Sequence, residues 1–209
     1  PRLWQRLQSV QNLRVTALGC AVSIILVVSM NLQTEMTLYD KNTRYLLVLA
    51  KVASVQFDTE ELQRLRENPQ TASDAFAQVQ DDLRTLLQQN PDITALSILV
   101  PTERADTYRY LIDTQRYDRD LDGDGRISAD EEPRLPGETI SFSERSAIYR
   151  ALGLPSAEEA SRLSDFGYTR RAYVPIVDAE RNTIATLQLD VTQDEYRRDI
   201  LTTRISFLT

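Results

Sequence analysis

The sequence predicts an α+β protein with a transmembrane helix, a long helix that continues from it, and an antiparallel sheet. Three observations support this fold class. Residues 15–30 carry no charge, and residues 31–57 repeat apolar side chains near helical spacing. Residues 93–113 and 168–192 each contain two short runs that are β-branched or alternating, as strands are. Two such hairpins can form one antiparallel sheet whose face the long helix covers.

Residues 1–14 are interpreted as a cytoplasmic N-terminus and residues 15–32 as the transmembrane helix. The uncharged part alone would span about 24 Å of a hydrocarbon core that is about 30 Å thick. Basic residues precede it, and the first acidic residue, Glu35, follows it. The basic residues are Arg2, Arg6 and Arg14. This asymmetry predicts that the N-terminus lies inside and the next domain outside the cell membrane.

Two alternatives apply to the apolar stretch. A cleaved signal peptide would fit Val27 and Ser29 as small residues before a cleavage site. A buried helix of a soluble protein is the other alternative, and the basic flank argues against it. At the other end, residues 201–209 finish in ISFLT after several arginines, which resembles the start of a second membrane helix. An ordinary helix end is the alternative there.

The remaining elements follow from caps and breakers. Ser/Thr/Asp residues followed three positions later by an acid predict helix starts. These pairs are Asp58 with Glu61, Thr71 with Asp74, Ser141 with Glu144, Ser156 with Glu159, and Thr192 with Glu195. The predicted strands are 93–100, 108–113, 168–177 and 183–192. The polar segment 114–139 is read as an insertion after the first hairpin.

Within that insertion, residues 120–131 read DLDGDGRISADE, which is the complete EF-hand loop pattern. Alternate carboxylates converge on a calcium ion, and Gly125 supplies the left-handed turn that other residues adopt with strain. The predicted calcium ligands are the side chains of Asp120, Asp122, Asp124, Ser128 and Glu131 and the backbone carbonyl of Arg126. The alternative is an Asp/Gly-rich surface turn, in which the converging acids would repel each other.

The flanks of this loop differ from those of a paired EF-hand. A predicted strand precedes it, and Pro133 prevents a long helix from starting directly after it. An isolated loop of this kind is expected to bind Ca²⁺ with a dissociation constant of about 10⁻⁴ to 10⁻³ M, as extracellular modules do, or somewhat more tightly.

The composition limits the function classes. The chain has 209 residues, a formal net charge of −7, no histidine and one cysteine. A nucleic-acid partner is not expected, because phosphate binding needs a basic face. Without histidine, Ser/His/Asp catalysis, Cys/His catalysis and the usual zinc sites are excluded. No acidic pair stands out beyond the calcium loop, so this chain is not expected to be an enzyme itself.

The segment 165–177, DFGYTRRAYVPIV, and the following strand ending in LQLDV resemble the single Cache (PAS-like) sensor domains of bacterial transmembrane receptors. The acidic insertion and the Pro136-Gly137-Glu138 turn are similar to an Asp-rich Cache subgroup. The family often has small polar residues where this chain has Arg170 and Arg171. The resemblance implies a PAS-like sheet and an extracytoplasmic sensor domain over residues 33–200, anchored in the bacterial cytoplasmic membrane.

The family binds small molecules over the sheet. Strand alternation places Arg171 and Tyr173 on one face with Asp190 of the neighbouring strand. The candidate ligand-binding residues are Tyr108, Tyr110, Arg171, Tyr173 and Asp190. An arginine near tyrosines suits a carboxylate ligand. The alternative is a structural ion pair between Arg171 and Asp190 or Asp113, without a ligand.

The leading hypothesis is therefore a sensory input domain of a membrane receptor that binds Ca²⁺ and a small ligand. A homodimer through the long N-terminal helix is expected, as is a periplasmic or extracellular location for the main domain. The second hypothesis is an adhesion or assembly module that calcium stiffens.

Overall fold

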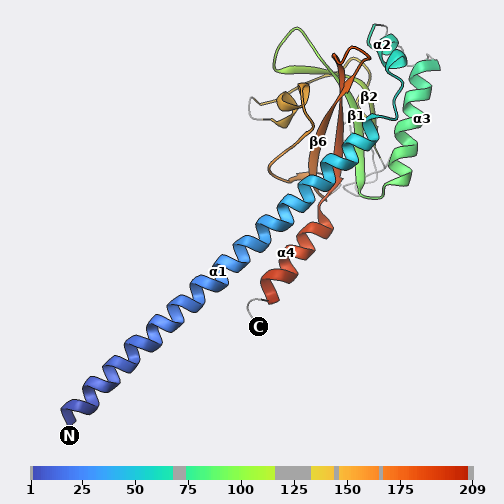
Figure 1. The fold of residues 1–209 in the computed structure, drawn as a ribbon. Coiled ribbons are helices and arrows are strands. Elements are labelled where there is room, and N and C mark those ends of the chain that lie inside the picture. Colours follow the sequence, from blue (N-terminus) through green and yellow to red (C-terminus); the bar gives the residue numbers. More distant parts are fainter. Residues whose placement is uncertain (1, 68–73, 116–132, 144–145, 165–166, 207–209) are drawn as a thin grey trace. The chain divides into compact units, whose positions relative to one another are not determined.

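The computed structural model describes residues 2–67, 74–115, 133–143, 146–164 and 167–206 (Figure 1). The chain divides into two compact units, one formed by Pro1–Asn42 with Tyr196–Thr209 and the other by Thr43–Glu195. The first unit contains most of helix α1 (Arg2–Ser54) and of helix α4 (Asp194–Ser206). The second contains the sheet.

Helix α1 runs without interruption through the predicted apolar stretch. From Ala17 to Ser54 it is long and apolar enough to cross a membrane, and no residue of its apolar window is buried. The predicted helix over residues 15–57 is thus confirmed as far as Ser54. Its insertion into a membrane stays a prediction.

The sheet is antiparallel throughout, as predicted. Its strands are β1 (Ile93–Pro101), β2 (Thr107–Gln115), β3 (Thr139–Ser141), β4 (Ser156–Ala157), β5 (Arg162–Ser164), β6 (Gly167–Val177) and β7 (Thr183–Thr192). They follow the order β3-β2-β1-β7-β6-β4, and β5 also pairs with β6. The two predicted hairpins, β1–β2 and β6–β7, join where β1 pairs with β7. The predicted α+β class, a long N-terminal helix with an antiparallel sheet, is confirmed.

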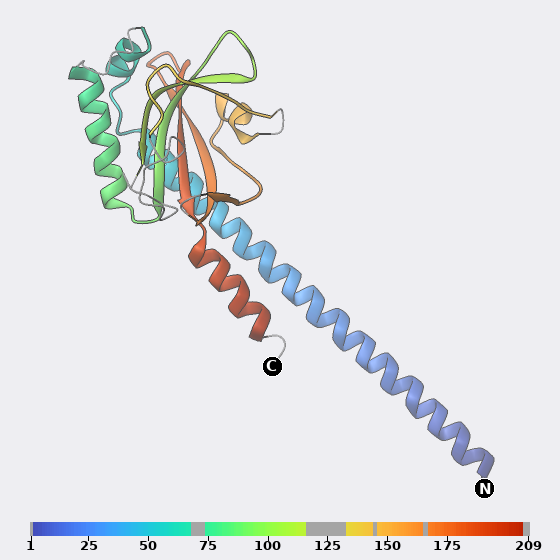
Figure 2. The same cartoon turned by 180° about the vertical axis from the view of Figure 1, so that it is seen from behind.

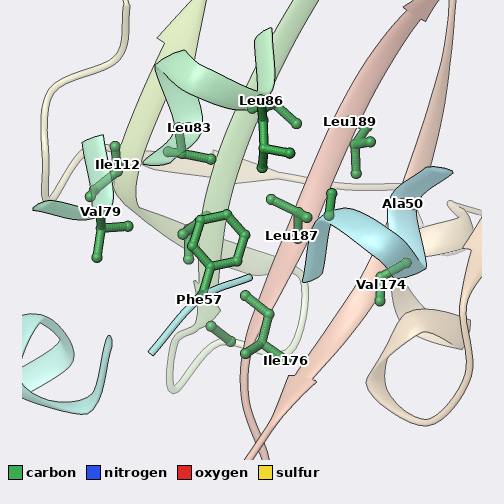
Figure 3. Packing of buried hydrophobic residues seen from close by; sticks show 14 of the residues in the cluster. Ala50, Phe57, Val79, Leu83, Leu86, Ile112, Val174, Ile176, Leu187 and Leu189 are labelled. Atoms are coloured by element: carbon green, nitrogen blue, oxygen red, sulfur yellow. The ribbon is translucent and has the colours of Figure 1, made fainter. Parts of the chain in front are cut away.

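Helices cover one face of this sheet. Helix α2 (Thr59–Glu67) and helix α3 (Asp74–Gln89) pack there with the C-terminal part of α1, and Figure 3 shows the core between them and the strands. Phe57, Leu83 and Leu187 are among its buried side chains. Asp58 begins α2 as predicted, since its Oδ1 accepts a hydrogen bond from the Glu60 amide at 2.8 Å.

The apolar repeat that identified α1, which includes Tyr45, Leu49 and Val52, faces the core only in part, since Leu49 packs against it. Leu46, Ala50 and Ala53, at helical spacing, are the α1 residues buried against the sheet. Tyr45 and Val52, which belong to the repeat, are exposed. Two apolar stripes therefore run along this part of α1, and only one of them is covered within the described chain.

The opposite face of the sheet carries a smaller core. The 3-10 helix η1 (Ala147–Leu152) lies on the side of the sheet away from α3, as the two views show (Figures 1 and 2). The buried apolar residues of this smaller core come from the strands, from η1 and from the segment before η1. They are Leu99, Tyr108, Tyr110, Phe142, Ala147, Ile148, Ala151 and Tyr173. The rings of Tyr108 and Phe142 meet edge to face with centroids 5.5 Å apart.

Two predicted helices are wrong. Ser156 does not begin a helix, because Ser156 and Ala157 pair with β6 as strand β4. The Ser156 hydroxyl donates to the Ala147 carbonyl at 2.6 Å, so it is not available as a cap. Ser141 ends strand β3 instead of opening a helix, and the helical residues described between Ser141 and Gly153 are those of η1.

The chain returns from the predicted insertion along β2. The Gly137 amide donates to the Tyr110 carbonyl, and the Tyr110 amide donates to the Glu138 carbonyl, both at 2.9 Å. Gly137 has a φ of 95°, which other residues adopt only with strain. The insertion is therefore shorter than predicted, since β2 extends to Gln115 and residues from Pro133 onward are ordered beside it.

Candidate functional site

A row of polar side chains crosses the face of the sheet that carries η1. Backbone pairing sets Ser97 of β1 opposite Asp113 of β2 on one side and Gln188 of β7 on the other. Gln188 in turn lies opposite Tyr173 of β6. Neighbouring strands place such opposed side chains on the same face, so this row is continuous from β2 to β6. Asp113, Ser97 and Gln188 are all buried.

Asp113 is held in place by hydrogen bonds. Its Oδ1 accepts from the Ser97 hydroxyl at 2.5 Å, and its Oδ2 accepts from the Arg134 amide at 2.8 Å. Burial raises the pKa of Asp113 above that of an ordinary aspartate, while these two hydrogen bonds oppose the rise. The carboxyl group is thus fixed in position, and its ionised form is disfavoured.

Arg171 and Asp190 form the ion pair of this face. They are direct cross-strand partners, and the Arg171 Nε lies 3.1 Å from both carboxylate oxygens of Asp190. Their side chains keep 26% and 10% of their surface exposed. Burial alone would lower the pKa of Arg171, but the attraction of Asp190 outweighs it and the pKa is raised. The pair predicted as the structural alternative is therefore present.

This pairing does not use the whole guanidinium group. The contacts recorded among the described residues use only the Nε of Arg171, so its two terminal nitrogens remain able to donate. Asp190 also accepts from the Gln188 Nε2 at 3.1 Å. An ion pair and a ligand contact are therefore compatible at Arg171.

On this face, two buried polar atoms of β7 have no hydrogen-bond partner in the described part of the chain. They are the Oε1 of Gln188 and the Oγ1 of Thr186. Both residues lie on β7 two positions apart, so their side chains share a face. A buried acceptor without a donor costs folding free energy. A bound molecule that donates to Gln188 would remove this cost.

The predicted tyrosines lie on the same face but differ from the polar row in role. Tyr108, Tyr110 and Tyr173 are buried in the smaller apolar core. Burial, with a further contribution from Asp113, raises the pKa of Tyr110 to about 12. The phenols are therefore neutral hydrogen-bonding groups at physiological pH.

Glu158 connects the start of η1 with strand β6 through hydrogen bonds. Its Oε1 accepts from the Ser146 hydroxyl at 2.6 Å and from the Ala147 amide at 3.3 Å, and the Tyr173 hydroxyl lies 3.5 Å away. The Arg170 Nε donates to the Glu158 carbonyl at 2.6 Å. Arg170 is thus a structural residue, in contrast to its neighbour Arg171 on the other face of β6.

The structure brings the five predicted ligand-binding residues to one face of the sheet. Sequence reasoning missed Ser97 and Glu158, which bear no pattern of their own before the strand register is known. Asp113 was considered only as a possible ion-pair partner of Arg171. The predicted calcium ligands, from Asp120 to Glu131, lie outside the described residues.

No protein-family model matches the chain, and no curated protein matches it significantly. Among solved structures, the chain is similar to the extracellular domain of vpHK1S-Z8, which is named as a histidine kinase. The TM-score is 0.48 at 13% identity, over 82% of this chain and 59% of that one. It is also similar to the sensory domain of the Campylobacter jejuni chemoreceptor Tlp3 (CcmL), with a TM-score of 0.40 at 11% identity, over 79% of this chain and 66% of that one.

A third structure is the ligand-binding domain of Tlp3 in complex with L-valine. Its TM-score is 0.38 at 11% identity, over 80% of this chain and 66% of that one. The chain spans less than two thirds of the length of these solved chains. At such scores the likeness assigns neither a ligand nor an activity.

Proposed function

We propose that the chain is an extracytoplasmic sensory input domain of a membrane receptor, of the single Cache (PAS-like) type, that binds a small ligand and Ca²⁺. One observation carries the ligand-binding part: a buried polar row on the sheet in which Gln188 lacks a hydrogen-bond partner among the described residues. A buried polar group in a face that serves stability alone normally has a hydrogen-bond partner, because burial without one costs folding free energy. Recognition of a polar molecule explains the presence of this row.

The charges of this face define the ligand class. The terminal nitrogens of Arg171 suit a carboxylate, which guanidinium groups bind through two parallel hydrogen bonds. Asp113 and the Oε1 of Gln188 lie in the same row and accept hydrogen bonds. A small molecule that bears a carboxylate together with an ammonium or hydroxyl group can bind both the donors of Arg171 and these acceptors. Small carboxylates and amino acids are the first candidates.

Calorimetry tests this proposal. The 209-residue chain, in mild detergent with Ca²⁺ present, is titrated with a panel of small carboxylates and amino acids. At least one compound is expected to bind, and Arg171→Ala is expected to weaken it about tenfold or more. Arg162→Ala, which removes an exposed arginine from β5, is the matched control and is expected to have no effect. A panel without any binding heat would contradict a ligand role for this face.

The calcium proposal rests on the loop pattern from Asp120 to Glu131. The described residues on both sides of the loop lie next to the polar row. Strand β2 carries Asp113 and ends at Gln115, and the returning chain is bound to Asp113 through the Arg134 amide. The segment that contains the loop therefore begins and ends beside the proposed ligand site.

The membrane and dimer proposals rest on α1. Exposed apolar residues follow one another at intervals of three and four positions in its part within the second unit, as in helix-pairing seams. They are Tyr45, Val48 and Val52, with exposed fractions of 47%, 62% and 54%, and Val55, which is 75% exposed, follows directly after the helix end at Ser54. A second copy of the chain that packs along this stripe would cover it. Residues 15–32 anchor the dimer in the bacterial cytoplasmic membrane, with the sheet domain outside the cytoplasm.

A further inference from the structure

A groove opens at the end of the sheet where β1 passes into β2 and β6 into β7. Its volume is about 970 Å³, and it is lined by the last turn of α2, the β1–β2 connection and the β6–β7 turn. Arg109 lines it from β2, between Tyr108 and Tyr110. Because side chains alternate along a strand, Arg109 lies on the face opposite these tyrosines. The groove is therefore separate from the polar row.

Two arginines in this groove, Arg66 and Arg109, form only weak contacts with the described part of the chain. No carboxylate in the described part of the chain lies within ion-pair distance of Arg66 or Arg109. Their recorded hydrogen bonds are long: Arg109 Nη2 to the Arg66 carbonyl and Arg66 Nη1 to the Ile184 carbonyl, each at 3.4 Å. Both guanidinium groups thus retain most of their capacity to donate.

The Nε of Arg109 is buried and has no hydrogen-bond partner among the described residues. A buried, charged donor without an acceptor costs more folding free energy than a neutral one. Since water reaches this nitrogen poorly, an oxygen-rich anion in the groove would supply the acceptor. This is the observation that distinguishes Arg109 from an ordinary surface arginine.

The acidic residues of the groove limit the size and charge of such an anion. Glu67, Glu103 and Asp178 also line it. The Asp178 carboxylate is already used, since it accepts from the Asn182 amide at 2.7 Å and from its side-chain nitrogen at 3.2 Å. Repulsion by these carboxylates disfavours long polyanions such as nucleic acid. A small molecule can reach the arginines without approaching every acid.

We propose that this groove binds a small organic anion with two oxyanion groups, carboxylate or phosphate, held by Arg66 and Arg109. Two guanidinium groups on different elements match two such groups, and each fork can bind one of them through paired hydrogen bonds. The groove is much larger than a single inorganic ion requires. It constitutes a second ligand site, on the opposite face from the proposed sensory ligand.

The test uses the 209-residue chain in mild detergent, titrated by calorimetry with succinate and, separately, with 3-phosphoglycerate. Each probe carries two oxyanion groups, and the pair distinguishes a dicarboxylate from a phosphate-bearing anion. Arg109→Met and Arg66→Gln are each expected to weaken binding about tenfold or more. Because Arg66 is exposed, Arg66→Gln decides the question even if Arg109→Met fails to fold.

Two further variants are controls. Arg64→Gln removes a charge from the same helix outside the groove, where Arg64 forms only an exposed pair with Glu60. Arg171→Met removes the arginine of the polar row. Neither is expected to change the affinity of the groove for the probes, and any binding heat that is lost only in Arg171→Met is assigned to the polar row. In ¹⁵N-edited NMR spectra, the Nε–H signal of Arg109, identified by its loss in Arg109→Met, is expected to shift on binding.

Three results would overturn the proposal. They are no binding of either probe, an equal loss of affinity in Arg64→Gln, or a loss confined to Arg171→Met. The first would show that the groove binds neither class. The second would reduce the effect to overall charge, and the third would place the anion at the polar row. The proposed sensory function would survive the first two results.

Discussion

The backbone amide of Arg134 donates to Oδ2 of Asp113 at 2.8 Å, although 21 positions separate these residues in the chain. Asp113 precedes the segment that contains the predicted calcium loop, and Arg134 follows it. This hydrogen bond therefore joins the two ends of the insertion. It also connects the insertion with Ser97 and the polar row, because the other oxygen of Asp113 accepts from Ser97.

The raised pKa of Asp113 predicts a pH-dependent stability. The folded state keeps the Asp113 proton at a higher pH than the unfolded state. Its contribution to stability is therefore largest below the ordinary aspartate pKa, and it is lost as the pH rises through the folded pKa. Asp113→Asn cannot titrate, so it should gain stability relative to wild type as the pH rises above about 4, by at most about 1.4 kcal/mol per pH unit.

Urea unfolding of both proteins at several pH values between 4 and 7 measures this difference. Asp82→Asn, a substitution on α3 outside the polar row, serves as the control. A difference between Asp113→Asn and wild type that stays constant over this range would show that Asp113 ionises normally.

The Arg171–Asp190 pair predicts non-additive substitutions. Arg171→Met leaves the mostly buried Asp190 with a weaker set of donors, so it should destabilise the fold by about 1–3 kcal/mol. Asp190→Asn should act in the same direction. The double variant should lose less than the sum of the two, because neither charge is then left alone. A double-mutant cycle by chemical denaturation measures the coupling; strictly additive losses would mean that the pair contributes nothing.

Calcium is expected to raise the melting temperature of the chain. Binding to the folded state alone stabilises it by mass action. Asp122→Ala combined with Glu131→Gln should abolish this rise, since both are predicted ligands. Glu132→Gln, beside the loop, removes one of the two negative charges that the double variant removes, and it should leave the rise intact. Melting curves that do not differ between calcium and a chelator would exclude the site.

The exposed stripe on α1 predicts a dimer that charged substitutions disrupt. Val48→Lys with Val52→Lys places like charges on both copies at a proposed apolar contact, so the dimer should dissociate. Sedimentation of the 209-residue chain in detergent distinguishes dimer from monomer. Gln88→Lys, on an exposed position of α3, should not change the mass. A monomeric wild-type chain would show that something else covers the stripe.

The main elements were predictable because their signals are local. The cap at Asp58, the uncharged stretch at residues 15–30 and the mostly apolar, β-branched run of β1 each lie within the element that they define or next to it. The predicted helix from Ser156 failed because a long-range partner, β6, decided the outcome. Pairing with a strand outweighed a capping pattern whose serine donates elsewhere.

The candidate site was predictable only in part for the same reason. Alternation along β6 and β7 was enough to group Arg171, Tyr173 and Asp190. Ser97 could not be assigned, because it belongs to the polar row only through the register of β1 with its two neighbours. The sequence also offers no sign that Arg109 lies in a groove with Arg66, since strand β2 and helix α2 are far apart in the chain.

Strand β7 continues almost directly into α4. It carries Gln188 and Asp190, ends at Thr192, and is followed by α4 from Asp194. The Thr192 amide donates to the Asp92 carbonyl at 2.8 Å and the Gln193 amide to the Tyr168 carbonyl at 2.7 Å, so the junction is held on both sides. A single residue, Gln193, separates the end of β7 from the start of α4. The backbone that follows Asp190 is therefore fixed by hydrogen bonds to two other segments of the sheet domain before α4 begins.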